Sequence, residues 1–266
     1  MEVDRLIDWD APWLAALRAL QPLLRGGHWR CALSDAARER RIVSGHGVPI
    51  AFVGPDAAAS VPYELFIART GKVPTRENLH DLFNALIWLV YPVAKAALNA
   101  RQAAEIERDG VRPTRGAARD AATLIDESAV LLVCRDEEVV ASLREHHWQR
   151  LLIAWRERWG RDIVALPFGH ALLEKLAGPF KAITACVVPL LATADPDAAA
   201  AAFIGRPDLA PPLLPHLPVL GIPGWCAENA DPHFYDDPRV FRPPRATLCH
   251  SGPDASACRD PALRSG

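Results

Sequence analysis

One long segment of the chain carries its polar residues along a single narrow face. Residues 78–107 read NLHDLFNALIWLVYPVAKAALNARQAAEIE, which has the length and composition of a helix. At 100° per residue, an arc of about 100° holds a group that we call the polar stripe: His80, Asp81, Asn84, Trp88, Tyr91, Lys95, Asn99 and Gln102. The rest of the circumference is mainly apolar. We therefore expect a buried helix whose polar stripe faces either a cavity or an internal hydrogen-bonded network.

Local signals mark the start and the interior of this segment. Asn78, followed three residues later by Asp81, resembles a capping arrangement and places His80 in the first helical turn. Pro92 lies well inside the helical pattern, where its ring clashes with a preceding carbonyl and where it offers no N–H. The sequence predicts one long central helix with a kink beside the polar stripe.

The other periodicities predict short strands mixed with helices. Before the long helix we expect helices at 12–24, 34–41 and 63–69, and a strand at 48–53. After it we expect strands at 121–125, 129–134, 163–168 and 183–191, and helices at 137–146, 148–159 and 169–176. The first two of these strands would form a hairpin through a turn at Asp126, Glu127 and Ser128. The pattern is typical of an α+β fold with a small mixed or antiparallel sheet packed with helices.

A proline-rich stretch at 207–245 lacks clear periodicity but is rich in large apolar residues, including Trp225, Phe234 and Tyr235. Disordered linkers are depleted in such residues. We expect an extended C-terminal arm that wraps over the body and buries its aromatic rings. Residues 1–245 are predicted to form a single α+β domain that includes this arm, and residues 246–266 a disordered tail.

Length and charge limit the functional class. A chain of 266 residues, of which 50% are apolar, can bury a substantial core. The net charge of −2 provides no basic field, which disfavours a nucleic-acid partner. The N-terminal sequence lacks a signal-peptide pattern, and no segment reaches the roughly 18 to 20 uncharged apolar residues of a membrane span. With six scattered cysteines read as free thiols, we expect a cytoplasmic protein without a membrane partner.

The polar stripe offers groups for catalysis and binding. His80 can exchange a proton near neutral pH, which makes it a candidate catalytic residue. Lys95 can hold an anion, whereas Asn84, Asn99 and Tyr91 can orient a substrate through hydrogen bonds. The alternative is structural: these groups satisfy backbone atoms freed by the proline, and Asp81 only stabilises the helix N-terminus.

A second candidate lies at a predicted junction between a strand and a helix. His170 and Glu174 are one helical turn apart, so they can share a proton or hold one divalent cation together. We expect both to be catalytic. A metal site needs a third ligand, from His80, from Asp81, or from Asp126 and Glu127. The cofactor therefore stays unknown, with a divalent metal ion as one option.

Three runs of sequence resemble a known family: YELFIARTGKVPTRENLHDLFNALIWLVYPVAKAALNARQAAEI at 63–106, FGHALLEKLAGPFKAITA at 168–185 and LPVLGIPGWCAENADPHFYDDPRVFRP at 217–243. They are similar to the bacterial family called domain of unknown function 3025, and the likeness covers roughly residues 10–245. The resemblance implies a single-domain housekeeping or accessory protein. It brings no activity, cofactor or catalytic residue to carry over.

Two functions remain open at this point. The first is a hydrolase-type acid/base enzyme with a polar pocket between the 78–107 helix and the His170 junction, with or without a metal ion. The second is a non-catalytic protein in which the polar stripe is a structural network and the aromatic arm contacts a partner. The partner is accordingly an unknown small molecule or an unknown protein.

Overall fold

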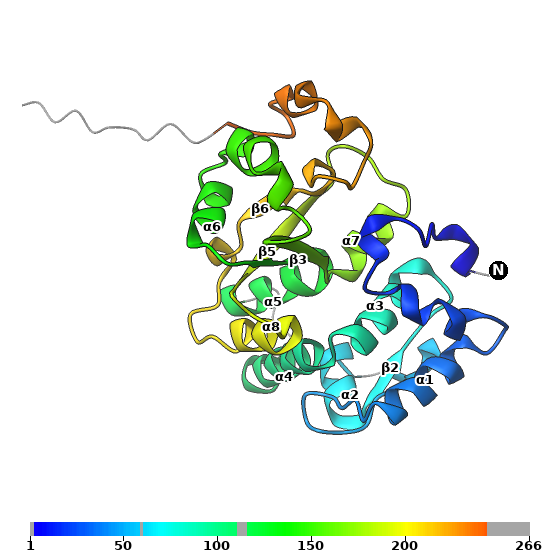
Figure 1. Ribbon diagram of the computed structural model, residues 1–266. Coiled ribbons are helices and arrows are strands. Elements are labelled where there is room, and N and C mark those ends of the chain that lie inside the picture. Colours follow the sequence, from blue (N-terminus) through cyan, green and yellow to red (C-terminus); the bar gives the residue numbers. More distant parts are fainter. Residues whose placement is uncertain (1–2, 59–60, 111–115, 244–266) are drawn as a thin grey trace, which may run out of the picture.

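The computed structural model describes residues 3–58, 61–110 and 116–243 (Figure 1), and its main sheet has the strand order β4-β3-β5-β6. Strand β3 (Ala129–Cys134) pairs antiparallel with β4 (Ile163–Pro167) and parallel with β5 (Thr184–Leu191). Strand β6 (His216–Pro218) pairs antiparallel with β5. A second, parallel sheet consists of β1 (Ala51–Val53) and β2 (Lys72–Pro74). A small mixed sheet surrounded by helices confirms the predicted α+β class.

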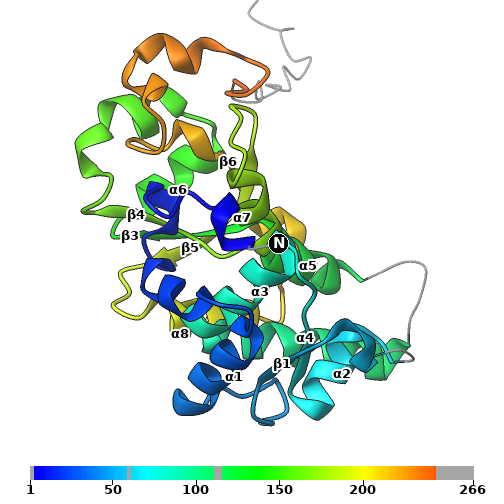
Figure 2. The ribbon, with the colours of Figure 1, turned by 90° about the vertical axis from the view of Figure 1, so that its right-hand side faces the viewer.

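The helices come both before and after the sheet strands in the chain. Their bounds are α1 Trp29–Glu39, α2 Tyr63–Thr70, α3 Leu79–Val90, α4 Pro92–Asp109, α5 Ala117–Ser128, α6 Glu137–Arg144, α7 His170–Leu176 and α8 Pro196–Ile204. Figures 1 and 2 place α1, α2 and the β1–β2 sheet at one end of the molecule, and the C-terminal arm at the opposite end.

The central strands separate two hydrophobic cores because successive side chains of a strand point to opposite faces. On one face, Leu131 and Val188 join a core built with α3, α4, α5 and α8. On the other face, Val130 and Val187 join a core built with α6 and the C-terminal arm. Since both cores share β3 and β5, the same two strands position the helices on either side.

The C-terminal arm is confirmed: residues 207–243 add the edge strand β6 to the sheet and pack the rings of Trp225, Tyr235 and Phe241 into the second core. Trp225 and Tyr235 are 8% and 4% exposed. The Tyr235 hydroxyl donates to the Gly221 carbonyl at 3.0 Å, and Asn229 donates to two further carbonyls of the arm. The arm therefore completes the second core, and these two rings are not available as a contact surface for a partner. The tail predicted at 246–266 lies outside the described residues.

The long helix is broken rather than kinked: the chain bends by 113° between α3 and α4. Tyr91 leaves the helical conformation with φ −125° and ψ 60°, and Pro92 becomes the first residue of α4. Proline is well tolerated at that position, because the first turn of a helix has no internal partner for its N–H groups. Asp197 of α8 accepts the N–H groups of Val93 and Ala94 at 3.0 and 2.8 Å, so a distant helix caps α4.

The strand predicted at 121–125 is wrong, because these residues belong to α5. Ala121, Ala122 and Ile125 are its fully buried residues, at a helical spacing. A short apolar run does not distinguish a helix from a strand. The predicted hairpin turn is consequently wrong as well: Asp126 and Glu127 lie in the last turn of α5, and β3 follows at once.

Other local predictions also differ from the structure. The helix predicted at 12–24 is a pair of 3₁₀ segments, Pro12–Leu14 and Arg18–Leu24, and that predicted at 148–159 is a π-helical turn, Gln149–Ala154, followed by a 3₁₀ turn. Helix α1 starts at Trp29, ahead of Ser34, whose hydroxyl accepts the Phe52 N–H at 2.9 Å and ties α1 to β1. Helix α8 was not predicted.

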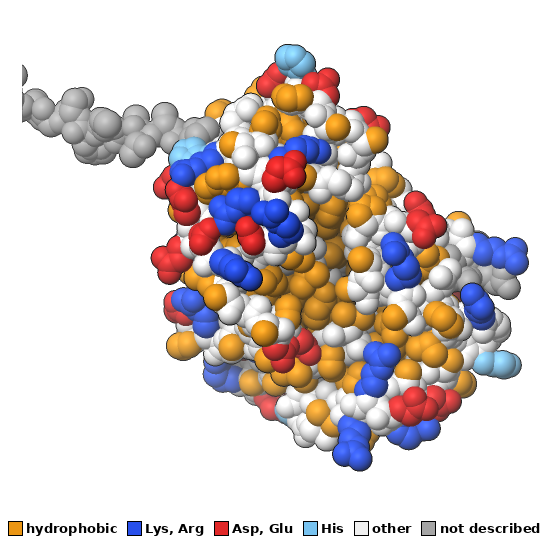
Figure 3. All heavy atoms as spheres, viewed as in Figure 1, with side chains coloured by type: hydrophobic (Ala, Val, Ile, Leu, Met, Phe, Trp, Pro, Cys, Tyr) orange, Lys and Arg blue, Asp and Glu red, His pale blue; other side chains and the backbone are white. Residues whose placement is uncertain are grey.

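The surface shown in Figure 3 mixes Lys and Arg with Asp and Glu around its outer parts, and hydrophobic side chains gather in the hollow at its centre. Within the described ranges, no single helix has the length and apolarity needed to cross a membrane; only α3 and α4 together reach that composition, across their bend.

Candidate functional site

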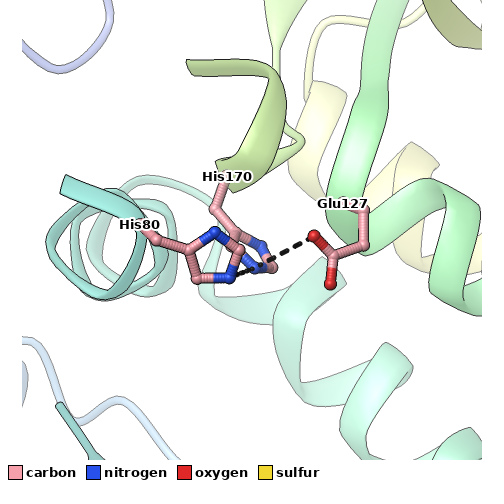
Figure 4. Close-up of side chains that lie close together, drawn as sticks. All are labelled: His80, Glu127 and His170. Carbon is pink, nitrogen blue, oxygen red and sulfur yellow. Dashed lines mark hydrogen bonds and ion pairs between the residues drawn. The ribbon is translucent and has the colours of Figure 1, made fainter. Parts of the chain in front are cut away.

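Three helix ends meet at one place and bring together His80, Glu127 and His170 (Figure 4). His80 lies in the first turn of α3, where the Asn78 side chain accepts the Asp81 N–H at 2.8 Å. Asp81 in turn accepts the N–H of residue 76 at 2.7 Å. These two bonds define the start of α3 and so fix the position of His80: Asn78 caps the helix as the pattern predicted, whereas the Asp81 side chain bonds the backbone of Arg76 and not that of Asn78.

A glycine allows the other two helix ends to approach each other. Gly169 precedes α7, and a Cβ atom built on it would lie 2.4 Å from the Ser128 nitrogen and 2.5 Å from the Glu127 carbonyl oxygen. The N–H groups of Phe168 and Gly169 both donate to the Ala129 carbonyl at 2.9 Å. Since a side chain would not fit, only glycine lets His170, the first residue of α7, lie beside the end of α5.

The reactive atoms of the cluster lie close together. The Nε2 atoms of His80 and His170 are 3.0 Å apart, with the two rings nearly perpendicular at 80°. The Nε2 atom of His170 is also 3.5 Å from a carboxylate oxygen of Glu127. In Figure 4 the two rings and this carboxylate point toward a common centre.

Each imidazole has a carboxylate on its other side. The Nδ1 atom of His80 is 2.8 Å from a Glu174 oxygen, so Glu174 of α7 partners a histidine of α3 instead of His170. The Nδ1 atom of His170 faces Asp126 at 3.8 Å and has no hydrogen-bond partner among the described residues, although His170 is only 4% exposed. Burial lowers the pKa of His170 below its ordinary value, against the opposing effect of Asp126.

Asp126 is held in place by a buried lysine. Lys95 donates to Asp126 at 2.5 Å and to the Asn84 side-chain oxygen at 2.8 Å, and it is only 4% exposed. Burial alone would raise the pKa of Asp126, but Lys95 and then His170 lower it below its ordinary value. Lys95 is therefore occupied by an ion pair and not free to hold an anionic substrate.

Glu64 of α2 is a second unusual carboxyl group. Asn99 donates to its side chain and to its carbonyl, both at 2.8 Å, and the Gln102 amide group lies 3.2 Å from its carboxylate oxygens, where it can donate as well. Burial, followed by the nearby charge of Asp126, raises the pKa of Glu64 to about 7. A lone glutamate in a first helical turn gives no sequence signal beyond its favourable interaction with the helix dipole, so sequence reasoning missed it.

A cavity of about 450 Å³ opens over these groups. It is lined by polar residues with a few apolar ones: Pro55, Val61, Tyr63, Glu64, Pro74, Arg76, His80, Asp81, Asn84, Asp126, Glu127 and His170. A concave site with convergent polar groups and a carboxyl group of shifted pKa is the general form of a ligand-binding pocket.

The structure thus divides the residues expected at the site. His80, Asp81, Asn84, Asp126, Glu127 and His170 line the cavity. Three other residues do not line the cavity but bond to residues that do: Glu174 to His80, Lys95 to Asp126 and Asn99 to Glu64. Tyr91 lies elsewhere: its ring packs on Phe168 with centroids 5.6 Å apart, and its hydroxyl is buried without a hydrogen-bond partner among the described residues.

Comparison with known proteins identifies a family without assigning an activity. No curated protein and no solved structure matches the chain. The profile of a family described as "Protein of unknown function (DUF3025)" matches residues 50–245, which include every residue of the cluster and of the cavity. The likeness noted in the sequence is confirmed, and the chain belongs to the DUF3025 family.

Proposed function

We propose that the protein is a hydrolase and that the cavity over His80, Glu127 and His170 is its active site. The observation that carries this proposal is the convergence of two imidazoles and a carboxylate on one accessible cavity, each imidazole being backed by a further carboxylate. The side chains of His80 and Glu127 are 37% and 42% exposed, so solvent reaches the cluster. Groups of this kind activate water by taking its proton and return the proton to a leaving group.

The roles within the site follow from the contacts. The His80–Glu127–His170 cluster binds and activates the attacking water. Glu174 orients His80, and Asp126, held by Lys95, faces His170. Glu64 has a pKa of about 7 and lines the same cavity, which suits it to transfer protons at neutral pH.

The charge of the lining supports an uncharged substrate. Glu64, Asp81, Asp126 and Glu127 line the cavity, whereas Arg76 is its one lysine or arginine among the described residues. Lys95 is already paired with Asp126. An amide or an ester therefore fits the cavity better than a phosphate or carboxylate substrate, and Asn84 is placed to bond its carbonyl.

We also place this activity in the cytoplasm, with a small molecule as the partner. The support is chemical: Cys31, Cys134, Cys186 and Cys226 are all free thiols, as is usual for proteins of a reducing compartment.

The test is a hydrolysis screen with chromogenic p-nitrophenyl esters, amino-acid p-nitroanilides and p-nitrophenyl phosphates. We expect turnover of an ester or amide, reduced about 100-fold or more in Glu127→Gln, because loss of an acid/base group typically costs a factor of about 10² to 10⁴. His46→Ala is the matched control, because it changes an exposed histidine that does not line the cavity. Equal rates in the wild type, Glu127→Gln and His46→Ala would rule the cavity out as the active site.

A thermal melt of the same variants separates the enzyme from a purely structural network. Exposed groups kept for catalysis add little to stability, so His80→Ala and Glu127→Gln should melt close to the wild type. A structural hydrogen-bonded network would lose roughly 1 to 3 kcal/mol on deletion of one buried partner. Large losses in both variants together with no turnover would favour the network.

A further inference from the structure

The two facing imidazoles raise a proton-counting problem. Their Nε2 atoms are 3.0 Å apart, so in a simple hydrogen bond one nitrogen carries a proton and the other accepts it. Which nitrogen holds the proton in each ring is set by the bond made by the other nitrogen of that ring. Both Nδ1 atoms therefore have to be considered first.

The Nδ1 side fixes the tautomer of His80. An ionised carboxylate only accepts hydrogen bonds, so the 2.8 Å contact with Glu174 requires a proton on Nδ1 of His80. In the neutral ring, Nε2 of His80 is then a bare lone pair that points at His170.

The neutral ring of His170 has no satisfactory arrangement on its own. With its proton on Nδ1, toward Asp126, its Nε2 lone pair faces the lone pair of His80 at 3.0 Å. With its proton on Nε2, the bare Nδ1 atom is buried without a partner and faces a carboxylate oxygen at 3.8 Å. Protons on both nitrogens would place a positive charge on a ring that is only 4% exposed.

We propose that a divalent transition-metal ion, zinc in particular, binds between His80 Nε2, His170 Nε2 and a carboxylate oxygen of Glu127. A cation at this point turns two repelling lone pairs into two ligands and lets both Nδ1 atoms keep their protons toward Glu174 and Asp126. Two imidazoles and one carboxylate are an established ligand set for catalytic zinc.

The distances fit this ion. Zinc bonds of about 2.0 to 2.1 Å in tetrahedral geometry place neighbouring ligand atoms about 3.3 Å apart. The observed separations, 3.0 Å between the nitrogens and 3.5 Å from nitrogen to oxygen, lie on either side of that value. All three ligand atoms lie within 4.8 Å of one another, so small side-chain rotations complete the site.

The surroundings match those of a metal site as well. A histidine that binds a metal usually donates its other N–H to a carboxylate, which orients the ring and makes it a better ligand. Glu174 takes this place for His80 at 2.8 Å. Asp126 faces Nδ1 of His170 at 3.8 Å, and Lys95, which also donates to Asn84, holds Asp126 in position. Three protein ligands leave a fourth position for water, on the side where the cavity opens.

Metal binding deepens the proposed hydrolase, since bound zinc lowers the pKa of its water ligand to about 7. It can nevertheless be measured without any substrate. The experiment is isothermal titration of the chelator-treated full-length protein with Zn²⁺, accompanied by visible spectra after addition of Co²⁺, whose absorption reports the coordination geometry.

We expect one tightly bound Zn²⁺ per chain and intense visible Co²⁺ bands. His80→Ala and Glu127→Gln are partly exposed positions that should fold normally, and they should weaken zinc binding by at least about 100-fold. Glu174→Gln should weaken it by about 10- to 100-fold, and the control His46→Ala should leave it unchanged. Restoration of part of the affinity by Glu127→Asp would identify the carboxylate as a ligand.

Weak zinc binding that is equal in the wild type, His80→Ala and His46→Ala would overturn the proposal, as would tighter binding of Mg²⁺ than of Zn²⁺. The outcomes also separate the two proposals. Zinc binding that is weakened in His80→Ala and Glu127→Gln, with no turnover in the hydrolysis screen, would refute the hydrolase proposal and support the metal site. Turnover that persists in chelator without any bound metal would keep the hydrolase and count against the metal site.

Discussion

Replacing Lys95 by methionine tests how strongly the buried ion pair behind the cavity supports the fold. The substitution keeps most of the aliphatic stem but removes the ammonium group that contacts Asp126 at 2.5 Å and Asn84 at 2.8 Å. Lys95 and Asp126 have side chains that are only 4% and 13% exposed, so the variant leaves a carboxylate in a poorly solvated position without its cation. Breaking a buried pair in this way typically costs about 3 to 5 kcal/mol.

That loss is a large part of the free energy of unfolding of a typical protein, about 5 to 15 kcal/mol. For a chain of this size it corresponds to roughly 2 to 4 °C in melting temperature per kcal/mol, or about 10 °C in total. Urea denaturation at pH 7, followed by circular dichroism, measures it directly. Arg38→Ala is the matched control, because the Arg38–Asp35 pair is 73% and 58% exposed and such pairs contribute only about 0 to 1 kcal/mol.

The loss should also depend on pH. In the wild type the pKa of Asp126 is lowered, so its contribution to stability is present above the unfolded pKa, about 3.9, and disappears as the pH falls through the folded value. In Lys95→Met the unpaired carboxyl takes up a proton more readily. The difference from the wild type should therefore be largest at pH 7 and shrink toward pH 4.

Two results would refute this reasoning. A loss below about 1 kcal/mol at pH 7 would mean that Asp126 is solvated and the pair is no stronger than a surface pair. A double variant, Lys95→Met with Asp126→Leu, should recover much of the loss, because an apolar pair of similar volume often replaces a buried ion pair at little cost. If the double variant is as unstable as the single one, the loss comes from packing and not from the unpaired charge.

Three further predictions concern other parts of the structure. Gly169→Ala places a Cβ atom 2.4 Å from a backbone nitrogen, so it should lower the urea midpoint of unfolding. It should also weaken zinc binding, because it separates His170 from Glu127. Gly27→Ala, whose Cβ atom would point into open space, should affect neither property. Asp197→Ala removes the cap of α4 and should cost about 1 to 2 kcal/mol in the same assay; an unchanged midpoint would show that the 113° bend needs no cap. The pKa of Glu64 is raised to about 7 in the folded protein, so its neutral form stabilises the fold fully below about pH 4.5, and this contribution is lost as the pH rises through 7. Glu64→Gln should therefore flatten the fall in the free energy of unfolding between about pH 4.5 and 7. Parallel pH profiles for the wild type and the variant would contradict this prediction.

Much of the local framework can be read from the sequence. The apolar runs at 129–134, 163–168 and 183–191 form β3, β4 and β5 within about one residue, because a buried strand needs a continuous apolar stretch. Asn78 and Asp81 define the start of α3 through bonds between near neighbours. The apolar content of the 207–243 segment excluded a disordered linker. These features depend on residues close together in the chain.

The bend between α3 and α4 shows where local reading stops. Pro92 indicated a disturbance, but the angle depends on Asp197, more than 100 positions away, which caps the new helix. In a straight helix Asn84 and Lys95 would be about 16 Å apart along the axis, since each residue adds 1.5 Å. Across the bend, the Lys95 ammonium group donates to the Asn84 side-chain oxygen at 2.8 Å, so part of the polar stripe lines the cavity and part forms a buried network behind it.

The convergence of His80, Glu127 and His170 was decided by tertiary structure. The sequence identified His80, His170, Glu127 and Glu174 as candidate residues, but the helical spacing paired Glu174 with His170, whereas it contacts His80 from the neighbouring helix. Side-chain chemistry and helix ends are local properties and can be predicted from the sequence. Which helix ends meet depends on the packing of two cores across β3 and β5 and on a glycine that lets α7 touch α5. Contacts between residues about 90 positions apart are set by that packing, and no local pattern encodes them.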